Sequence, residues 1–174
     1  MLKIDISDIL VEVGSSKDFS GWVEIGNIPF GHETILFRDP LQMEGTVVNL
    51  GELILLRAHL GGAAALQCGV CLEHYDYIVD YDIEVNLKAI SDGDNPDIYT
   101  YANESIELGD IVISEFLLRL PIQRKCSQGC RGLCTQCGTN LNIKECKCYN
   151  LEDQTIDPRL EVMKKIFADR DGEV

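Results

Sequence analysis

Residues 75–88 read YDYIVDYDIEVNLK. Every odd position in this run is apolar or aromatic, and every even position except Ile78 is acidic, amide or basic. A period of two is typical of a strand that buries one face and exposes the other to water. At about 3.3 Å per residue such a strand is about 45 Å long, so we expect it to curl with its sheet.

Weaker signals on the N-terminal side also favour β-structure. Residues 1–8 alternate and residues 22–25 are rich in β-formers, so each run indicates a strand. Residues 44–67 predict a β-meander, with turns expected at Gly51 and at the pair Gly61-Gly62. Residues 91–97 have the composition of a loop.

Two segments have a helical period. Residues 110–120, DIVISEFLLRL, carry a broad apolar stripe, with Asp110 as a capping residue and Pro121 as the stop. Asp157 and Pro158 are suited to begin a second helix that docks through one apolar face.

Together these signals predict an α+β fold. We expect mostly antiparallel β-structure in a curled sheet or partial barrel, a packed helix, a cysteine-rich zinc module and a C-terminal helix. The expected division is a β-rich domain at 1–122, which includes the first helix, and a zinc-binding module with the terminal helix at 123–174.

The composition restricts the class of protein. The 174 residues carry a net charge of −14, which argues against a protein that coats nucleic acid. The N-terminus lacks the features of a secretory signal, and no apolar run reaches the length of a membrane span. We therefore expect a cytoplasmic protein, in which paired cysteines more often hold metal or perform redox chemistry than form structural disulfides.

Six of the eight cysteines lie in residues 126–148, which read CSQGCRGLCTQCGTNLNIKECKC. A spacing of two residues lets two thiolates reach one ion, and the glycine after the second cysteine tolerates a positive φ. Cysteines two apart in an extended segment point the same way and can complete the set. The first predicted zinc site therefore comprises Cys134, Cys137, Cys146 and Cys148.

Four cysteines remain, in two further close pairs. They predict a second zinc site that links the β-rich part to the cysteine-rich part. Its expected ligands are Cys68, Cys71, Cys126 and Cys130, and His74 is close enough in sequence to replace one of them.

Other uses of the cysteines are less consistent with the sequence. The spacings differ from ferredoxin patterns, and the alternating strand after Cys71 argues against a thioredoxin-like redox pair at Cys68 and Cys71. A site closed by four thiolates leaves no position for water, so it is structural rather than catalytic. No catalytic triad, zincin motif or phosphate loop is present, and we expect no enzymatic activity and no small-molecule substrate.

Four blocks of sequence together resemble the YceD-type family, the large ribosomal RNA subunit accumulation proteins of bacteria and plastids. These blocks are LQCGVCLE, IELGDIVISEFLLRLP, CRGLCTQCGTNLN with CKC, and DPRLEVMKKI, and the resemblance spans roughly Ala63 to Phe167. It implies a non-enzymatic protein that is needed for normal levels of large-subunit ribosomal RNA and is associated with ribosome assembly. Some members lack the C-terminal cysteines, which implies that the Cys134–Cys148 site is a stabilising addition.

The distribution of charge suggests where a partner binds. Residues 119–149 hold six basic residues against Glu145, a formal +5, which leaves −19 for the rest of the chain. The candidate RNA-binding residues are Arg119, Arg124, Lys125, Arg131, Lys144 and Lys147. They contact phosphate or merely neutralise the zinc thiolates, and the sequence leaves both open.

The expected partner is ribosomal RNA, a large-subunit ribosomal protein or an assembly intermediate. One alternative is an acidic scaffold or chaperone for a basic ribosomal protein, which the negative charge of most of the chain favours. The other alternative is a thiol redox protein that uses Cys68 and Cys71, which metal occupancy of Cys68 would exclude.

Overall fold

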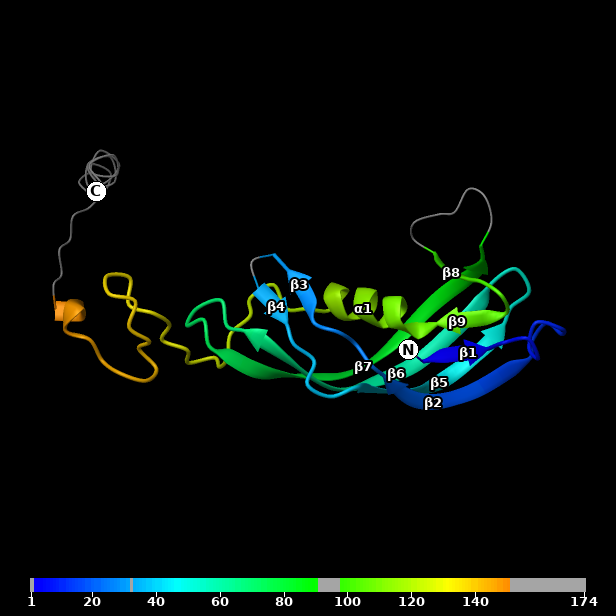
Figure 1. Ribbon diagram of the computed structural model, residues 1–174, viewed down its shortest axis with the longest axis horizontal. Helices are drawn as coiled ribbons and strands as arrows, with labels where there is room; N and C mark the ends of the chain where they lie inside the picture. Colours follow the sequence, from blue (N-terminus) through cyan, green and yellow to red (C-terminus); the bar gives the residue numbers. More distant parts are fainter. Residues whose placement is uncertain (1, 32, 91–97, 151–174) are drawn as a thin grey trace, which may run out of the picture. The chain divides into compact units, whose positions relative to one another are not determined.

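The computed structural model describes residues 2–31, 33–90 and 98–150 (Figure 1). The chain forms two compact units, Met1–Cys130 and Arg131–Val174. The first unit extends past residue 122, the boundary expected from the sequence, and includes Cys126 and Cys130. The expected loop at 91–97 and the expected C-terminal helix lie outside the described residues.

A five-stranded sheet in the order β2-β5-β6-β7-β8 organises the first unit (Figure 1). All pairs in it are antiparallel except β7 with β8, which is parallel. Two two-stranded sheets, β1-β9 and β3-β4, accompany it. The strands are β1 Lys3–Asp5, β2 Ser16–Val23, β3 Ile28–Phe30, β4 Glu33–Ile35, β5 Leu41–Asn49, β6 Ile54–Gln67, β7 His74–Ala89, β8 Tyr99–Tyr101 and β9 Ser105–Glu107.

The mostly antiparallel β-structure with one packed helix is therefore confirmed. Within the described residues the sheet stays open between β2 and β8, and no closed barrel forms. Strand β7 follows the alternation at 75–88, because Val79, Ile83 and Leu87 are buried in the core while the acidic residues between them are exposed.

The turn expected at Gly61-Gly62 is wrong. Strand β6 continues through both glycines and pairs with β7 along its whole length. Gly62 has a φ of +151°, and a Cβ atom there would lie 2.5 Å from Leu41 Cδ2. The missing side chain thus permits close packing within the sheet rather than a chain reversal. The turn expected at Gly51 is confirmed, with a φ of +99° between β5 and β6.

Helix α1 spans Leu108–Leu118 and packs on the sheet. The expected cap is wrong, because Glu107 occupies the N-cap position without a side-chain bond and Asp110 lies within the first turn. There its negative charge still favours the helix dipole. Phe116 is fully buried and forms edge contacts with the rings of Phe37 and Tyr77, at centroid distances of 5.1 and 6.2 Å. None of the helices in the described part of the chain has the length and apolar character needed to cross a membrane.

Candidate metal centres

The eight cysteines gather into two groups of four, and in each group the sulfur atoms lie within 4.8 Å of one another. These are the same two sets of four that the sequence spacing suggested. One group belongs wholly to the first unit and the other to the second. The first consists of Cys68, Cys71, Cys126 and Cys130, and the second of Cys134, Cys137, Cys146 and Cys148.

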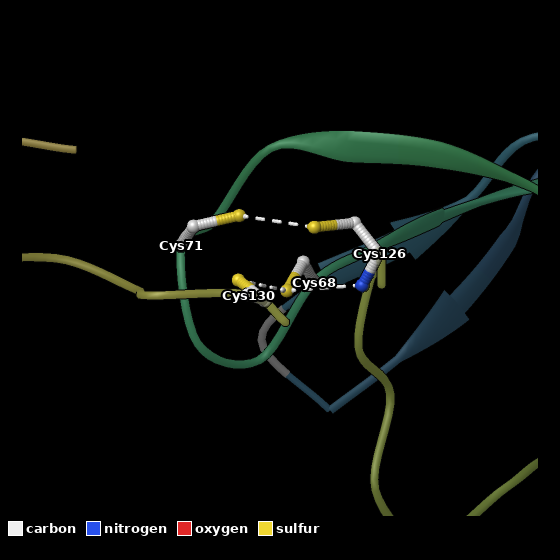
Figure 2. A group of neighbouring side chains, drawn as sticks. All are labelled: Cys68, Cys71, Cys126 and Cys130. Atoms are coloured by element: carbon white, nitrogen blue, oxygen red, sulfur yellow. Dashed lines mark hydrogen bonds between the residues drawn. The ribbon is translucent and has the colours of Figure 1, made fainter. Parts of the chain in front are cut away.

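The first group forms at the tip of the β6–β7 hairpin. Cys68 follows β6 directly, and both Cys68 and Cys71 are buried. The segment that leaves α1 brings Cys126 and Cys130 against them, so that the four sulfurs face a common centre (Figure 2). The Cys71 and Cys126 sulfurs are 3.7 Å apart, and those of Cys68 and Cys130 are 3.8 Å apart.

These separations fit one tetrahedral ion. With zinc–sulfur bonds of about 2.3 Å, the sulfurs of a tetrahedral site lie about 3.8 Å apart. A disulfide needs about 2.05 Å, and a multi-iron cluster would hold the thiolates farther apart than a single ion does. The donor set is four thiolates, which suits zinc among the common divalent metals. Bound zinc would supply a closed structural link at this position.

Backbone hydrogen bonds shape the first pair of ligands. The Cys68 N–H donates to the Glu73 carbonyl at 2.8 Å, and the Leu72 N–H donates to the Cys68 carbonyl at 2.9 Å. Leu72 takes a φ of +63° to make this turn. The Gly69 N–H donates to the Arg124 carbonyl at 2.8 Å, which anchors the segment that carries the other two cysteines.

The second group repeats this turn. The Cys134 N–H donates to the Thr139 carbonyl at 2.8 Å, and the Gly138 N–H donates to the Cys134 carbonyl at 2.8 Å. Gly138 has a φ of +71°, as the position after the second cysteine requires. The two turns therefore share both hydrogen bonds and the positive φ, although leucine stands in one where glycine stands in the other. Cys148 lies in a short 3₁₀-helix, η1, at Lys147–Asn150.

The crowding of thiols separates their pKa values. Burial raises the pKa of Cys68, but N–H groups of Cys71, Cys126 and Val70 favour its thiolate more strongly and lower the pKa from 9.0 to about 6. In the second group the Thr139 hydroxyl and N–H, with the Cys134 side chain, lower the pKa of Cys137 to about 6. Neighbouring thiols raise the pKa of Cys148 to about 11. The lowered pKa values favour the thiolate forms of Cys68 and Cys137, which are the forms that bind a metal.

Comparison with known proteins gives a family. The model of the family described as large ribosomal RNA subunit accumulation protein YceD matches residues 56–167 of the chain. The chain belongs to this family. The match contains most of β6, all of β7 and α1, and all eight cysteines. No curated protein and no solved structure matches the chain.

In this YceD-family chain, two of the basic residues singled out from the sequence make internal contacts. Arg124 forms an ion pair with Glu33, and its guanidinium lies 5.1 Å from the centroid of the Phe30 ring. Arg119 forms an ion pair with Glu115 one turn back in α1 and lies 5.0 Å from the centroid of the Tyr81 ring. These arginines hold the β3–β4 hairpin and the end of α1 in place.

The other basic candidates are on the surface. Lys125 is exposed in the first unit, and Lys144 and Lys147 are exposed in the second. Arg131 is also exposed and lies 3.6 Å from Glu145. His74, the alternative ligand, begins β7 and does not join either cysteine group among the described residues.

The Arg124–Glu33 pair is a feature that the sequence did not reveal. The two residues are 91 positions apart, and neither belongs to a motif. The pair connects β4 to the segment that bears Cys126, so it positions the first cysteine group without being a ligand. A basic residue two positions before a candidate ligand was the available signal, and it equally suited a phosphate contact.

Proposed function

We propose that this chain is a non-enzymatic, zinc-binding accessory factor required for the accumulation of large-subunit ribosomal RNA. The observation that carries the proposal is the family match over 56–167, a span that includes both cysteine groups. Four-thiolate sites are closed, so the zinc would stabilise the fold and would not activate water. The chain would act by binding a component of the assembling large subunit.

The contacts at the first group support a structural role for the metal. One ion there would join the β6–β7 hairpin to the segment after α1, where Cys126 and Cys130 follow residues with few backbone contacts to the sheet. Two hydrogen bonds donated by backbone N–H groups already join these parts, from the Gly69 N–H to the Arg124 carbonyl and from the Cys126 N–H to the Cys68 sulfur. A metal would add four strong bonds at the same place.

Depletion and complementation in the source organism test the proposal. Cells that lack the chain should show a lower ratio of large-subunit to small-subunit ribosomal RNA, and the wild-type gene should restore it. Cys71→Ser should restore the ratio only partly at matched protein levels. A normal ratio in depleted cells would contradict the proposed function.

A second candidate function is an acidic scaffold for a basic ribosomal protein. It is favoured by the open face of the central sheet, where side chains of β7 form an acidic row that α1 does not cover. The row consists of Asp76, Asp80, Asp82 and Glu84, whose side chains are 60–89% exposed. Together with the internal pairing of Arg119 and Arg124, this row favours a protein partner over RNA in the first unit.

Surface substitutions separate the two kinds of partner. Lys125→Ala with Lys144→Ala and Lys147→Ala should weaken RNA association and reduce its salt dependence if RNA is bound directly. Asp80→Asn with Asp82→Asn should instead weaken a basic protein partner. Arg124 is left unchanged in both sets, because its loss would disturb the first cysteine group.

The redox alternative requires Cys68 and Cys71 to be free of metal. Both thiols are buried beside two further thiols, whereas an exchange reaction needs access to the attacking sulfur. Elemental analysis of the protein purified under reducing conditions, compared with Cys68→Ser, reports whether Cys68 holds metal. Unchanged metal content in that variant would favour the redox role.

A further inference from the structure

Among the described residues, the edge of β7 that faces away from β6 lacks a strand partner over most of its length. Strand β7 pairs with β6 from His74 to Leu87, whereas β8 pairs only with Leu87, Lys88 and Ala89. In the described part of the chain, no backbone hydrogen bond reaches residues 74–86 from that side. A long free edge of this kind presents N–H and C=O groups that can pair with an added strand.

Two contacts show which backbone groups face the free edge. Arg119 Nη2 lies 3.5 Å from the Asp82 carbonyl oxygen, which therefore points away from β6. Ile90, the residue after β7, donates its N–H on the same side, to the carbonyl of Tyr101 in β8. The register between β6 and β7 runs without a bulge. Alternate residues of a strand direct both their N–H and their C=O groups to the same edge. The even-numbered residues from 76 to 86 therefore present their N–H and C=O groups to the free edge.

The side chains at the same even positions are mostly acidic. Asp76, Asp80, Asp82 and Glu84 are exposed on the open face of the sheet. Their neighbours on that face are Arg38, Arg57 and His59, at 2.9–3.5 Å. Four carboxylates against two arginines and one histidine leave the row negative at neutral pH. Leu118 at the end of α1, which is next to Arg119 in the chain, and Ile122 after it are largely exposed.

We propose, resting on the function proposed above, that the free edge of β7 binds an extended, lysine- or arginine-rich segment of a protein partner as an added antiparallel strand. Basic side chains at alternate positions of that segment would lie directly across from the acidic residues. The positions between them would face the side of the sheet on which α1 packs, and would be apolar. A second copy of this chain would place acidic rows side by side, and RNA would meet the same negative charge.

Synthetic peptides of alternating lysine and valine test the proposal on the full chain. N-methylation of the lysine amides should weaken binding at least about tenfold, because these amides point toward β7 in an antiparallel pair, whereas N-methylation of the valine amides should be tolerated. A peptide of alternating glutamate and valine should not bind. If both methylated peptides bind as well as the parent, attraction is by charge alone and strand addition is wrong.

Matched variants of the protein locate the site. Asp80→Asn with Asp82→Asn should reduce peptide affinity about fivefold at low salt. The control, Asp18→Asn with Glu44→Gln, removes the same charge from the same face on β2 and β5, away from the edge, and should leave affinity nearly unchanged. An equal loss in the control would overturn the assignment to the edge.

Two further observations would also overturn it. The first is that single-stranded RNA changes the amide NMR shifts of residues 76–86 as much as the peptide does. The second is that light scattering shows a dimer of the chain that the peptide dissociates. Failure of the peptide to bind is distinguishable from failure of the proposed function, because complementation reads ribosomal RNA levels and not peptide affinity.

Discussion

The two cysteine groups share one local turn but have different support. In both, the first cysteine donates its N–H five residues ahead and accepts from the residue four ahead, which has a positive φ. The first turn lies at the tip of a hairpin whose strands contribute to the hydrophobic core. In the second unit, none of the described residues joins that core, and Ile143 is 77% exposed. The metal site at the first turn would thus add to a fold that already has a hydrophobic core. The metal site at the second turn would have to stabilise its unit without one.

The largest expected effect is loss of the second unit when its metal site is broken. Structural zinc contributes about 10 kcal/mol of apparent folding free energy in small modules, and this unit has no apolar core among its described residues to replace it. Cys137→Ser should remove amide-exchange protection from residues 131–148 and leave β7 protected. Cys71→Ser should release only the hairpin tip and the segment around Cys126. Equal global unfolding in both variants would erase the contrast.

Breaking the ion pair behind the first group should have the next largest effect. Arg124 and Glu33 are only 24% and 12% exposed, so Arg124→Ala leaves a largely buried carboxylate unpaired. We expect a loss of about 3 kcal/mol in the free energy of unfolding of the first unit, measured by urea denaturation. The neighbouring exposed residue gives the control, and Lys125→Ala should change this free energy by less than about 0.5 kcal/mol. Matching losses would show that the pair carries no weight.

A smaller effect is expected from the residue after the second cysteine of each turn, which is Leu72 in the first group and Gly138 in the second. A left-handed conformation disfavours leucine relative to glycine by about 1 kcal/mol. Leu72→Gly should therefore tighten zinc at the first group, and Gly138→Ala should weaken zinc at the second group about fivefold. A Cβ at position 138 would meet no atom within 4 Å, so the change there is conformational only. Competition with a chelator measures both zinc affinities. If the two substitutions change affinity in the same direction, the explanation from backbone conformation is wrong.

The smallest effect concerns His59 on the open sheet face. A hydrogen bond from its ring to Asp82, together with the charges of Asp82, Asp80 and Glu44, outweighs the opposing effect of desolvation and raises the pKa of His59 above 6.5. The interaction of protonated His59 with these carboxylates therefore stabilises the folded state below pH 6.5, and this stabilisation is lost as the pH rises through the raised pKa. NMR titration should show this raised pKa and its decrease in Asp82→Asn. An unchanged pKa in that variant would remove Asp82 as the cause.

Local patterns predicted the elements that depend on local chemistry. The alternation at 75–88 gave β7, and the spacing of cysteines gave both groups of four, because strand period and ligand reach are properties of short segments. Residues that act over long distances were not accessible in this way. Gly61-Gly62 suited a turn, and its role in close packing depends on Leu41 in the neighbouring strand. Arg124 suited phosphate, and its pairing depends on Glu33.

Leu72 shows a third limit of local patterns. The glycine after Cys137 indicated a positive φ, whereas the leucine after Cys71 did not. Yet both residues donate their N–H to the carbonyl of the first cysteine in the turn. The hydrogen bonds of the first turn impose the conformation on a residue that does not favour it. The similarity of the two turns is therefore visible in the structure and hidden in the sequence.

Native mass spectrometry of the full chain, purified without added metal or chelator, tests the two-centre account most directly. We predict a mass that corresponds to two zinc ions per chain, and one zinc ion in each of Cys71→Ser and Cys137→Ser. A single zinc ion in the wild-type protein, iron in place of zinc, or loss of both ions in either single variant would contradict two independent four-thiolate centres.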